Sequence, residues 1–576
     1  MAKQQKVRKI DFSYKRLGKL ADKFYNEGKF IPALRFAYDQ LELYGGDGDI
    51  YVRLADIYES MGLHMSAIMW LYKFLDDCEE ADLPDIYEGL AINYLNLGNE
   101  SQSAYYYNLL IDVDDTLPEE TKLDIAAAFS GKKKDAFRFV YPPEAASYEK
   151  ELSYGSHALK NGDTVRALKA FSLVEKGSAE YAPAKEMEAV AYLLSDRAEE
   201  AERICLSLLE DVPQSVQAKA TLAAAYLEQG RLLESRALAE ELAAMPLNSA
   251  EELYKVATVC CENGMHEEAY QKFCLLEKEM PYDGRMLFFK AVSAYKSGRV
   301  TESAVAFETL CTIYPDAAVA EYYLQQLRES KEGDAPIEMG YFYRIPSAEK
   351  ERRKEMLERV TEFTSSEAQL FGEILEEDGL FVWCFDEMDG ADHDLQYLAL
   401  VAAEHTRADG FLREVLLEPE VADVLKVELL EVLLRRNEDA ALGMVLCNIY
   451  RKLLLLRIDV GRKKRKKFVE GYAKVASRFV AFSDGYAKRI KRTAEELYQA
   501  VEAYDQLDLC QSADDIACAI YLAAGLKELG LGKDVDAVAE AFGANAAIVR
   551  VLLTSVTSAK AGVGLAEKKG EEETKA

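Results

Sequence analysis

A glycine recurs along the first half of this chain at a nearly constant interval. Two runs show it, with spacings of 34 and 36 residues in the first and of 34 and 34 residues in the second: Gly28, Gly62 and Gly98, then Gly230, Gly264 and Gly298. An interval of this length is typical of a stack of helical hairpins, in which each repeat packs on its neighbours. It favours an interaction protein over a globular enzyme built around one pocket.

Small and large residues keep a fixed register with the glycine. The position seven residues earlier is small: Ala21, Ala55, Ala91, Gly155, Ala223, Ala257 and Ala291. The position five residues later is also small: Ala33, Ala67, Ser103, Ala167, Ser235, Ala269 and Ser303. An aromatic residue often lies four before the glycine, as at Phe24, Tyr58, Tyr94 and Tyr226. Small residues let two helices approach closely, and the glycine can end the first helix in a left-handed cap.

This pattern resembles the tetratricopeptide repeat, whose 34-residue unit has small, aromatic and glycine positions at these offsets. Eight units fit between about Leu17 and Pro315, with Gly162 in the fourth and Asp196 in place of the glycine in the fifth. The resemblance implies an all-α fold, a right-handed α-solenoid. Because the period is lost after Pro315, we expect a separate C-terminal helical domain.

Breaks in the period predict how the chain is divided. We expect a first block of three repeats (residues 1–116), a degenerate unit or kink (117–146), and a second block of five repeats with a capping helix (147–330). A linker (331–346), a helical domain (347–558) and a disordered tail (559–576) follow. The linker reads KEGDAPIEMGYFYRIP and contains two prolines and two glycines, which favour a loop.

Stacked hairpins expose a concave face lined by the first helix of each unit. The residues that we expect on it are acidic or polar in the first block and aromatic in the second: Asp56, Glu59, Glu88 and Asn96, then Tyr254, Phe288 and Tyr295. This face could bind a peptide with a basic end, or it could be solvated without a ligand. Some tetratricopeptide proteins clamp an acidic C-terminus here with cations, but Val52 and Asp56 do not suit that role.

A strongly basic strip lies outside the repeats. Residues 451–492 carry 15 Lys and Arg against three acidic residues, in a chain whose net charge is −31. Its centre is a run of six cations: Arg462, Lys463, Lys464, Arg465, Lys466 and Lys467. With the interleaved Phe468, Tyr472 and Phe479, the strip could bind nucleic acid or another polyanion. It could equally be a solvated face, or pair with the chain's own acidic surface, with the rings in the core.

The last predicted helices resemble the end of a cyclin-like repeat, as in transcription factor B, where a helix-turn-helix follows a small-residue helix. The resemblance covers about 45 residues up to Leu553. The segment in the place of a recognition helix has one basic residue, Arg550, whereas such helices present several polar side chains to the bases. We therefore interpret this as a likeness in packing.

Two further groups of residues bear on metal binding and on cysteine chemistry. Asp386, Glu387, Asp389, Asp392, His393, Asp394, Glu404 and His405 fall within about 20 residues, which could hold a divalent metal or form a polar loop. Their spacing matches no calcium loop and there is no H-E-x-x-H, so no metal or other cofactor is expected. The ten cysteines contain no C-x-x-C pair, and we expect buried thiols of a reducing compartment.

The sequence thus predicts a non-catalytic adaptor or scaffold that binds a protein segment in the solenoid groove. The alternative is a nucleic-acid-associated regulator that uses strip 451–492 and a degenerate helix-turn-helix. A helical domain with catalytic Asp389, His393 and His405 has the least support. No apolar run approaches the length of a membrane span, and we expect a cytoplasmic protein without membrane contact.

Overall fold

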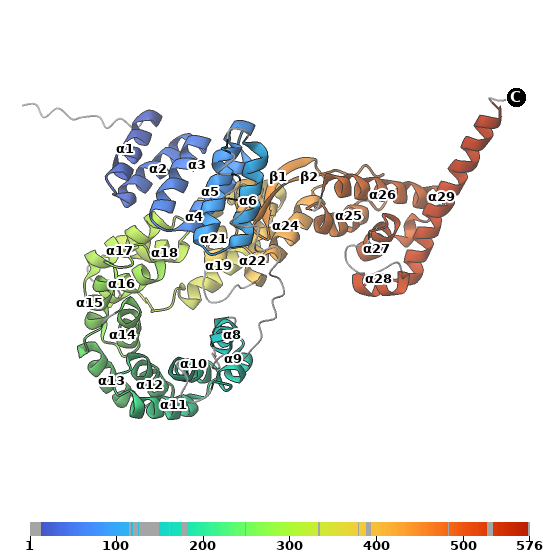
Figure 1. Cartoon of the computed structure of the whole chain (residues 1–576). Helices are drawn as coiled ribbons and strands as arrows, with labels where there is room; N and C mark the ends of the chain where they lie inside the picture. Colours follow the sequence, from blue (N-terminus) through green and yellow to red (C-terminus); the bar gives the residue numbers. More distant parts are fainter. Residues whose placement is uncertain are drawn as a thin grey trace, which may run out of the picture. The chain divides into compact units, whose positions relative to one another are not determined.

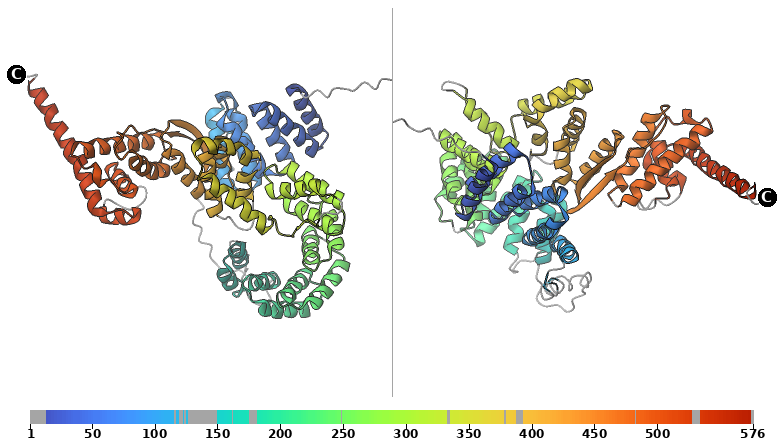
Figure 2. Two further views of the ribbon diagram at one scale, coloured as in Figure 1. Left: turned by 180° about the vertical axis from the view of Figure 1, so that it is seen from behind. Right: turned by 90° about the horizontal axis from the view of Figure 1, so that it is seen from above.

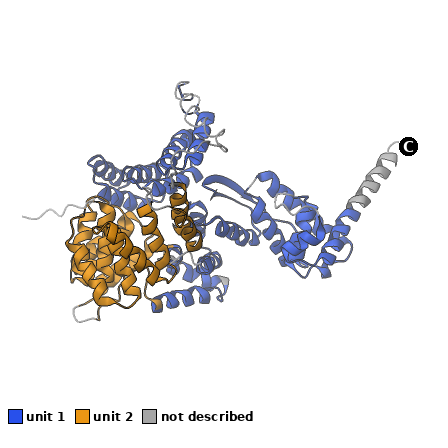
Figure 3. Cartoon of the chain, turned by 60° about the horizontal axis from the view of Figure 1, so that its bottom comes forward, with its two compact units in different colours: residues 1–129, 348–385, 390–576 blue, residues 130–347, 386–389 orange. Residues whose placement is uncertain are grey.

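The computed structural model describes residues 13–114, 149–160, 162–174, 181–247, 249–331, 335–377, 379–386, 393–481, 483–526 and 534–573, with four single positions between 115 and 148. The predicted degenerate segment 117–146 lies almost wholly outside these residues. Contacts divide the chain into two compact units (Figure 3). Unit 1 comprises residues 1–129, 348–385 and 390–576, and unit 2 comprises residues 130–347 and 386–389.

The first block of repeats belongs to unit 1 and consists of three helical hairpins. Their helices pair in chain order: α1 (Tyr14–Asn26) with α2 (Phe30–Tyr44), α3 (Gly48–Ser60) with α4 (His64–Asp76), and α5 (Leu83–Asn96) with α6 (Glu100–Val113). A short 3₁₀ turn, η1 (Glu80–Asp82), precedes α5. The Asp47 carboxylate accepts a hydrogen bond from the Ile50 amide (3.0 Å) and so caps α3.

The second block forms unit 2 and consists of five hairpins and one further helix. They are α8 (Glu149–Lys160) with α9 (Thr164–Phe171), α10 (Tyr181–Leu193) with α11 (Ala198–Asp211), α12 (Val216–Glu228) with α13 (Leu232–Ala244), α14 (Ala250–Glu262) with α15 (His266–Leu276), α16 (Gly284–Lys296) with α17 (Val300–Ile313), and α18 (Ala318–Glu329). In Figure 1 this block is an arc with α10, α12 and α14 on its inner side and α11, α13 and α15 on its outer side. The predicted all-α solenoid is confirmed.

The recurring glycine ends the first helix of each hairpin in a left-handed conformation, as predicted. All seven glycines of this position have φ between +69° and +83°: Gly28, Gly62, Gly98, Gly162, Gly230, Gly264 and Gly298. Asp196 takes the same place in the fifth hairpin with φ +56°. Left-handed backbone is open to glycine at little cost and tolerated by aspartate, so one turn geometry is kept through all eight hairpins.

The small positions lie where the two helices of a hairpin touch. Every residue five positions after the turn is fully buried, with 0% exposure: Ala33, Ala67, Ser103, Ala167, Ser235, Ala269 and Ser303. A larger side chain there would push the helices apart, because protein interiors are close-packed. The repeating small residues therefore mark the positions at which the two helices of each hairpin are in contact.

The chain after residue 346 is mostly helical. It forms α19 (Ser347–Val360), α20 (Ser365–Glu377), α21 (Leu380–Asp386), α22 (His393–Thr406), α23 (Asp409–Leu417), α24 (Asp423–Arg435), α25 (Arg465–Phe479), α26 (Asp484–Ala503), the 3₁₀ turn η2 (Leu507–Leu509), α27 (Ala513–Ala523), α28 (Val535–Phe542) and α29 (Ala546–Glu573). Helices α25, α26, α27 and α29 pack together around buried aromatic rings, and both views in Figure 2 show this cluster. The backbone of α29 is helical to Glu573, which differs from the predicted disordered tail.

One β-hairpin interrupts these helices and was not predicted. Strands β1 (Ala440–Leu446) and β2 (Ile449–Leu455) pair antiparallel from Ala440 with Leu455 to Leu446 with Ile449. Cys447 and Asn448 form the turn with φ +51° and +59°. Two consecutive residues with positive φ make the type I′ turn that matches the twist of a hairpin.

The tip of this β-hairpin is bound by tyrosines of the first block, within unit 1. Tyr72 Oη of α4 and Tyr106 Oη of α6 donate to the Asn448 carbonyl oxygen (2.9 and 3.3 Å). The Tyr450 amide donates to Tyr106 Oη (3.2 Å), and Tyr450 Oη donates to Asp76 (2.8 Å). The chain after residue 347 is thus attached to the first block by hydrogen bonds between residues more than 340 positions apart in sequence.

By length and hydropathy, none of the single helices in the described ranges meets the requirement for a membrane span. A pair that joins α28 to residues 546–559 meets it only in combination and is bent by 118° between its parts.

Candidate protein-binding faces of the solenoid

The inner face of the seventh and eighth hairpins carries aromatic residues. Phe288 is fully buried and Tyr295 is half-buried, both on α16, and the ring of Tyr254 on α14 lies 6.2 Å from that of Phe289. A segment of the same chain, residues 335–346, covers this face. The predicted groove of the second block is therefore occupied here, and the expected linker is its occupant.

Hydrogen bonds at both ends and in the middle hold this segment. The Ile337 amide donates to Tyr295 Oη (2.7 Å), and Tyr323 Oη of α18 donates to the Arg344 carbonyl oxygen (2.7 Å). Between these ends, Tyr343 Oη donates to the Asp386 carboxylate, with both oxygens at 3.1 Å. Asp386 is itself oriented by the Val319 amide, which donates to it at 2.8 Å.

Two tyrosine rings of the segment contact the inner face. The ring of Tyr343 packs edge-on against Phe288, with centroids 4.9 Å apart. The ring of Tyr341 lies 6.3 Å from Phe289 and beneath the Lys296 ammonium (5.6 Å), and its hydroxyl is 2.9 Å from His266 Nδ1. Aromatic pairs and cation–π contacts of this kind add to the free energy of burial.

Titratable groups around the segment are held neutral. Burial, followed by the nearby Cys261 thiol, raises the pKa of Tyr341, and burial with the Asp386 charge raises the pKa of Tyr343. Burial and the Lys296 charge lower the pKa of His266. These shifts favour the neutral forms of the His266 imidazole and of the two phenols of the segment, and neutral forms can both donate and accept hydrogen bonds.

The inner face of the first block carries acidic side chains. Asp56 of α3 and Glu88 of α5 are exposed and make no ion pair with any residue in the described ranges, and Asn96 at the end of α5 is exposed too. Glu59 accepts a hydrogen bond from Asn93 Nδ2 (2.8 Å). Desolvation by the surrounding helices and the neighbouring Glu59 raise the pKa of Asp56, so added negative charge is disfavoured there.

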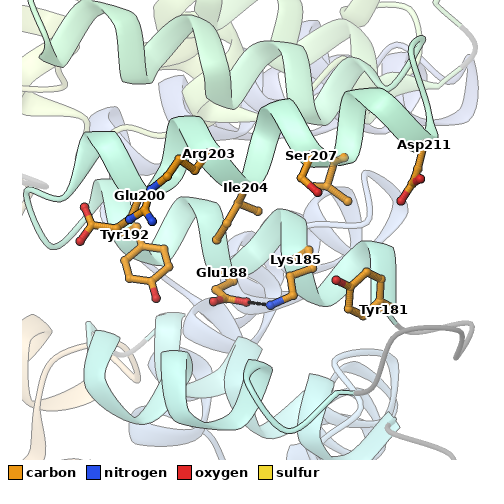
Figure 4. A pocket seen from close by; sticks show the side chains of 10 residues that line it. Tyr181, Lys185, Glu188, Tyr192, Glu200, Arg203, Ile204, Ser207 and Asp211 are labelled. Atoms are coloured by element: carbon orange, nitrogen blue, oxygen red, sulfur yellow. Dashed lines mark hydrogen bonds and ion pairs between the residues drawn. The ribbon is translucent and has the colours of Figure 1, made fainter.

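A hollow of about 290 Å³ lies against the fifth hairpin (Figure 4). Helices α10 and α11 line it with mostly polar side chains: Tyr181, Lys185, Glu188, Tyr192, Glu200, Arg203, Ile204, Ser207, Leu208 and Asp211. Two of its carboxylates are ion-paired, since Lys185 Nζ lies 2.5 Å from Glu188 and Arg197 Nη2 lies 2.7 Å from Glu200.

The basic strip divides into core and surface. Phe468, Tyr472 and Phe479 are fully buried, so these rings are part of the core and cannot stack on bases. Three cations of the central run have acidic or amide partners: Lys463 with Asp508 (3.3 Å), Lys464 with Gln511 (2.9 Å) and Lys467 with Glu470 (2.8 Å). Arg462, Arg465 and Lys466 are exposed, without an ion pair to the described residues.

The described residues of α28 and α29 do not support a helix-turn-helix that contacts bases. Gly543, with φ +64°, ends α28 and α29 begins at Ala546. Arg550, the one basic residue of the segment in the recognition position, is ion-paired with Asp536 of α28. The resemblance to a cyclin-like repeat stays a prediction.

The acidic and histidine cluster is not brought together where the structure describes it. His393 Nε2 lies 3.1 Å from Glu428, whereas His405 Nε2 lies 2.9 Å from the Phe363 carbonyl oxygen. Both histidines are on α22, twelve residues apart, which separates them by about 18 Å along the helix axis. Glu387, Asp389 and Asp392 lie outside the described residues, and the described ones hold no group of three ligands for a metal.

All ten cysteines are free thiols, and six of them are buried. Cys447 is the exposed one, at the turn of the β-hairpin, where its amide donates to Asp423 (3.1 Å). Three more, Cys78, Cys274 and Cys311, are half-buried, so the prediction of buried thiols holds for six of the ten.

The sequence of residues 337–345 contains a signal for binding in the groove, and the interpretation of residues 331–346 as a linker missed it. Apolar residues alternate with others at Ile337, Met339, Tyr341, Tyr343 and Ile345. A period of two is typical of an extended segment with one buried face. The alternation stands beside two prolines and two glycines, which favoured the loop interpretation.

Comparison with known proteins gives only distant similarities. No family model matches the sequence, and no curated protein matches it significantly. Among solved structures, a tetratricopeptide repeat protein from Parabacteroides merdae is 15% identical, with 50% of this chain and 98% of that chain covered and a TM-score of 0.22. The TPR2AB domain of yeast Sti1, solved with an Hsp90 peptide, is 18% identical (46% and 98% covered, TM-score 0.20).

A human IFIT1 dimer with PPP-AAAA is 15% identical (75% and 96% covered, TM-score 0.26). At these TM-scores the similarities carry no argument about shape or partners. The fold is identified by this chain's own features: the period, the left-handed turn residue and the buried small positions. By these features the two blocks of hairpins have the tetratricopeptide-repeat fold.

Proposed function

We propose that this protein is a non-catalytic, cytoplasmic adaptor that binds a protein segment along the inner faces of its two repeat blocks. One observation carries the proposal: the inner face of α14, α16 and α18 holds an extended stretch of polypeptide, residues 335–346. Side chains of the groove hydrogen-bond the main chain, and aromatic rings receive the side chains. This is the general way in which extended peptides are recognised.

The first block supports a basic partner segment. Its inner face carries Asp56, Glu59 and Glu88, and the raised pKa of Asp56 indicates that a nearby cation would stabilise the charged form of this carboxylate. Lys or Arg side chains of a partner would supply that charge. The interaction would weaken with salt, because exposed charges are screened within about 10 Å at 0.1 M ionic strength.

A selection from a library of random twelve-residue peptides, with the full-length protein as bait, tests the proposal. We expect basic peptides that Asp56→Lys/Glu88→Lys no longer binds. The matched control is Glu42→Lys/Asp112→Lys, which makes the same charge change on the second helices of two hairpins, where both residues are exposed. Equal binding by the two double variants would contradict the placement on the first block.

A second candidate function is binding of nucleic acid or another polyanion. It is favoured by the exposed cations Arg462, Arg465 and Lys466 at the start of α25, a helix with no acidic residue in its first turn. A helix N-terminus carries partial positive charge, so these cations are disfavoured there unless an anion is near. The rings of Phe468, Tyr472 and Phe479 lend this candidate no support, since they are buried.

A gel-shift series at increasing salt with single-stranded RNA tests the second candidate. Replacement of Arg462, Arg465 and Lys466 by Ser should abolish binding and flatten its salt dependence. The matched control replaces three exposed cations of α1, namely Lys15, Arg16 and Lys19, by Ser. Binding that is absent in the wild-type protein, or unchanged in the first triple variant, rejects the regulator alternative.

A further inference from the structure

The segment in the second groove presents its side chains in strict alternation. Met339 and Ile345 are 4% and 2% exposed, and Ile337, Tyr341 and Tyr343 are half-buried. The residues between them are exposed: Glu338, Gly340, Phe342 and Arg344. Phe342 is 62% exposed although it stands between two tyrosines that contact the groove. Extended backbone places alternate side chains on opposite faces, so one face reads the groove and the other faces solvent.

The groove provides two distinct aromatic subsites at this spacing. One is built from Phe289, Lys296 and His266 and receives Tyr341. The other is built from Phe288 and Asp386 and receives Tyr343. Each subsite combines a ring contact with one polar group placed for a phenol hydroxyl. A tyrosine is therefore recognised at both its ring and its tip.

Main-chain contacts fix the direction of the segment. Tyr295 Oη accepts from the Ile337 amide, and Tyr323 Oη donates to the Arg344 carbonyl oxygen. These two bonds are independent of side-chain identity, because they use backbone groups seven residues apart. Specificity is left to the tyrosine subsites between them.

We infer that the seventh and eighth hairpins form a binding groove for an extended partner segment with aromatic residues at alternate positions, Tyr-x-Tyr, and that residues 337–345 are its resident occupant. The inference rests on the proposed adaptor function and adds the partner's chemistry and its mode of entry. The partner binds by displacing the occupant, which remains tethered to the groove at both ends. Tethering gives the occupant an effective concentration of about 1 mM or more, so displacement needs a partner of matching chemistry and higher affinity.

The test is binding of a fluorescent peptide with the sequence of residues 335–346, measured by anisotropy on the full-length protein. Tyr341→Ser/Tyr343→Ser weakens the resident segment and frees the groove. We expect the peptide to bind this variant about tenfold or more tightly than it binds the wild-type protein. A peptide with Ser at both tyrosine positions should not bind.

Phe342→Ser is the matched control, since it removes an exposed aromatic ring from the same segment. It should bind the peptide as weakly as the wild-type protein does. If the double variant keeps its helical circular dichroism and yet binds no better than the wild-type protein, the inference is overturned. Equal gains in the double variant and in Phe342→Ser would overturn it as well.

A second measurement applies if the double variant does not fold. In the wild-type protein, excess free peptide should speed amide hydrogen exchange of residues 337–345, and the Ser-substituted peptide should not. No change with millimolar peptide would reject displacement. A protein that fails both tests but still selects basic peptides through its first block loses this inference and keeps the proposed function.

Discussion

Three serines take the place of alanine at the closest helix contacts of the repeats. Ser103, Ser235 and Ser303 are fully buried, and none of their hydroxyls has a hydrogen-bond partner. Burial of an unpaired hydroxyl costs about 1–3 kcal/mol. Other repeats carry alanine at this position with the same burial, as at Ala269.

Ser303→Ala should therefore stabilise the protein by about 1 kcal/mol, measured by urea denaturation of the full chain. Ser297→Ala is the control, because the Ser297 hydroxyl donates to the Ser293 carbonyl oxygen (2.8 Å) and its loss should bring no gain. A Ser303→Ala variant less stable than the wild-type protein would mean that the hydroxyl is satisfied by an interaction outside the repeats.

The turn residue offers a second test at the scale of one residue. Gly298 has φ +83°, and no atom lies within 4 Å of a Cβ placed on it. Gly298→Ala should nevertheless cost about 1 kcal/mol, since an L-residue is strained in left-handed backbone. Asp196→Gly, at the equivalent turn with φ +56°, should not destabilise the protein. Urea denaturation measures both, and a neutral Gly298→Ala would show that this turn is not conformationally restrictive.

At the scale of elements, the β-hairpin shows why some secondary structure could not be predicted from the sequence. The run Ala440–Leu446 is buried at four consecutive residues and does not alternate, so periodicity could not distinguish a short strand from a helix. Its turn, Cys447-Asn448, lacks the Asn-Gly signature of a two-residue hairpin. The strands pack against α4 of the first block, α23 and α26, which is a non-local cause.

Lys426 of α24 joins that helix to the hairpin and makes the stability of unit 1 depend on pH. Its side chain is fully buried, and Nζ donates to the Val445 carbonyl oxygen of β1 (2.8 Å). Burial lowers its pKa from 10.5 to about 8. Between these values the unfolded chain binds more protons than the folded one, so stability rises with pH.

We expect this lysine to add about 2 kcal/mol of stability between pH 8 and pH 10. Denaturation curves across that range should rise in the wild-type protein relative to Lys426→Met, in which the contribution is absent. Lys452→Met, which removes an exposed lysine of β2, should keep the rise. Parallel pH profiles for the wild-type protein and Lys426→Met would contradict the assignment.

At the scale of the whole molecule, the two units predict how the chain can be cut. Unit 2 is one continuous stretch apart from residues 386–389, whereas unit 1 combines residues 1–129 with residues after 347. Fragments 1–129 and 348–576 should therefore associate when expressed together. Their contact includes Tyr450 with Asp76 (2.8 Å) and Lys73 with Glu414 (2.9 Å).

Affinity co-purification of the two fragments measures this association. Asp76→Ala removes the hydrogen-bond partner of the half-buried Tyr450 hydroxyl and should weaken binding about tenfold, or about 1.4 kcal/mol. Asp77→Ala removes the adjacent exposed carboxylate and should have no effect. Fragments that remain separate would mean that the hydrogen bonds at the hairpin tip do not hold unit 1 together.

The sequence by itself determined the repeats: their number, the left-handed turn and the small residues at each helix contact. These features are local, because a hairpin of fixed length repeats the same backbone and the same neighbour contact in every unit. Only the tertiary structure decided what covers the repeats. Residues 337–345 lie on α14, α16 and α18, and the β-hairpin lies on α4 and α6, through bonds such as Tyr106 to Asn448 that span hundreds of residues. A periodic pattern records which faces are apolar, but not which distant segment will bury them.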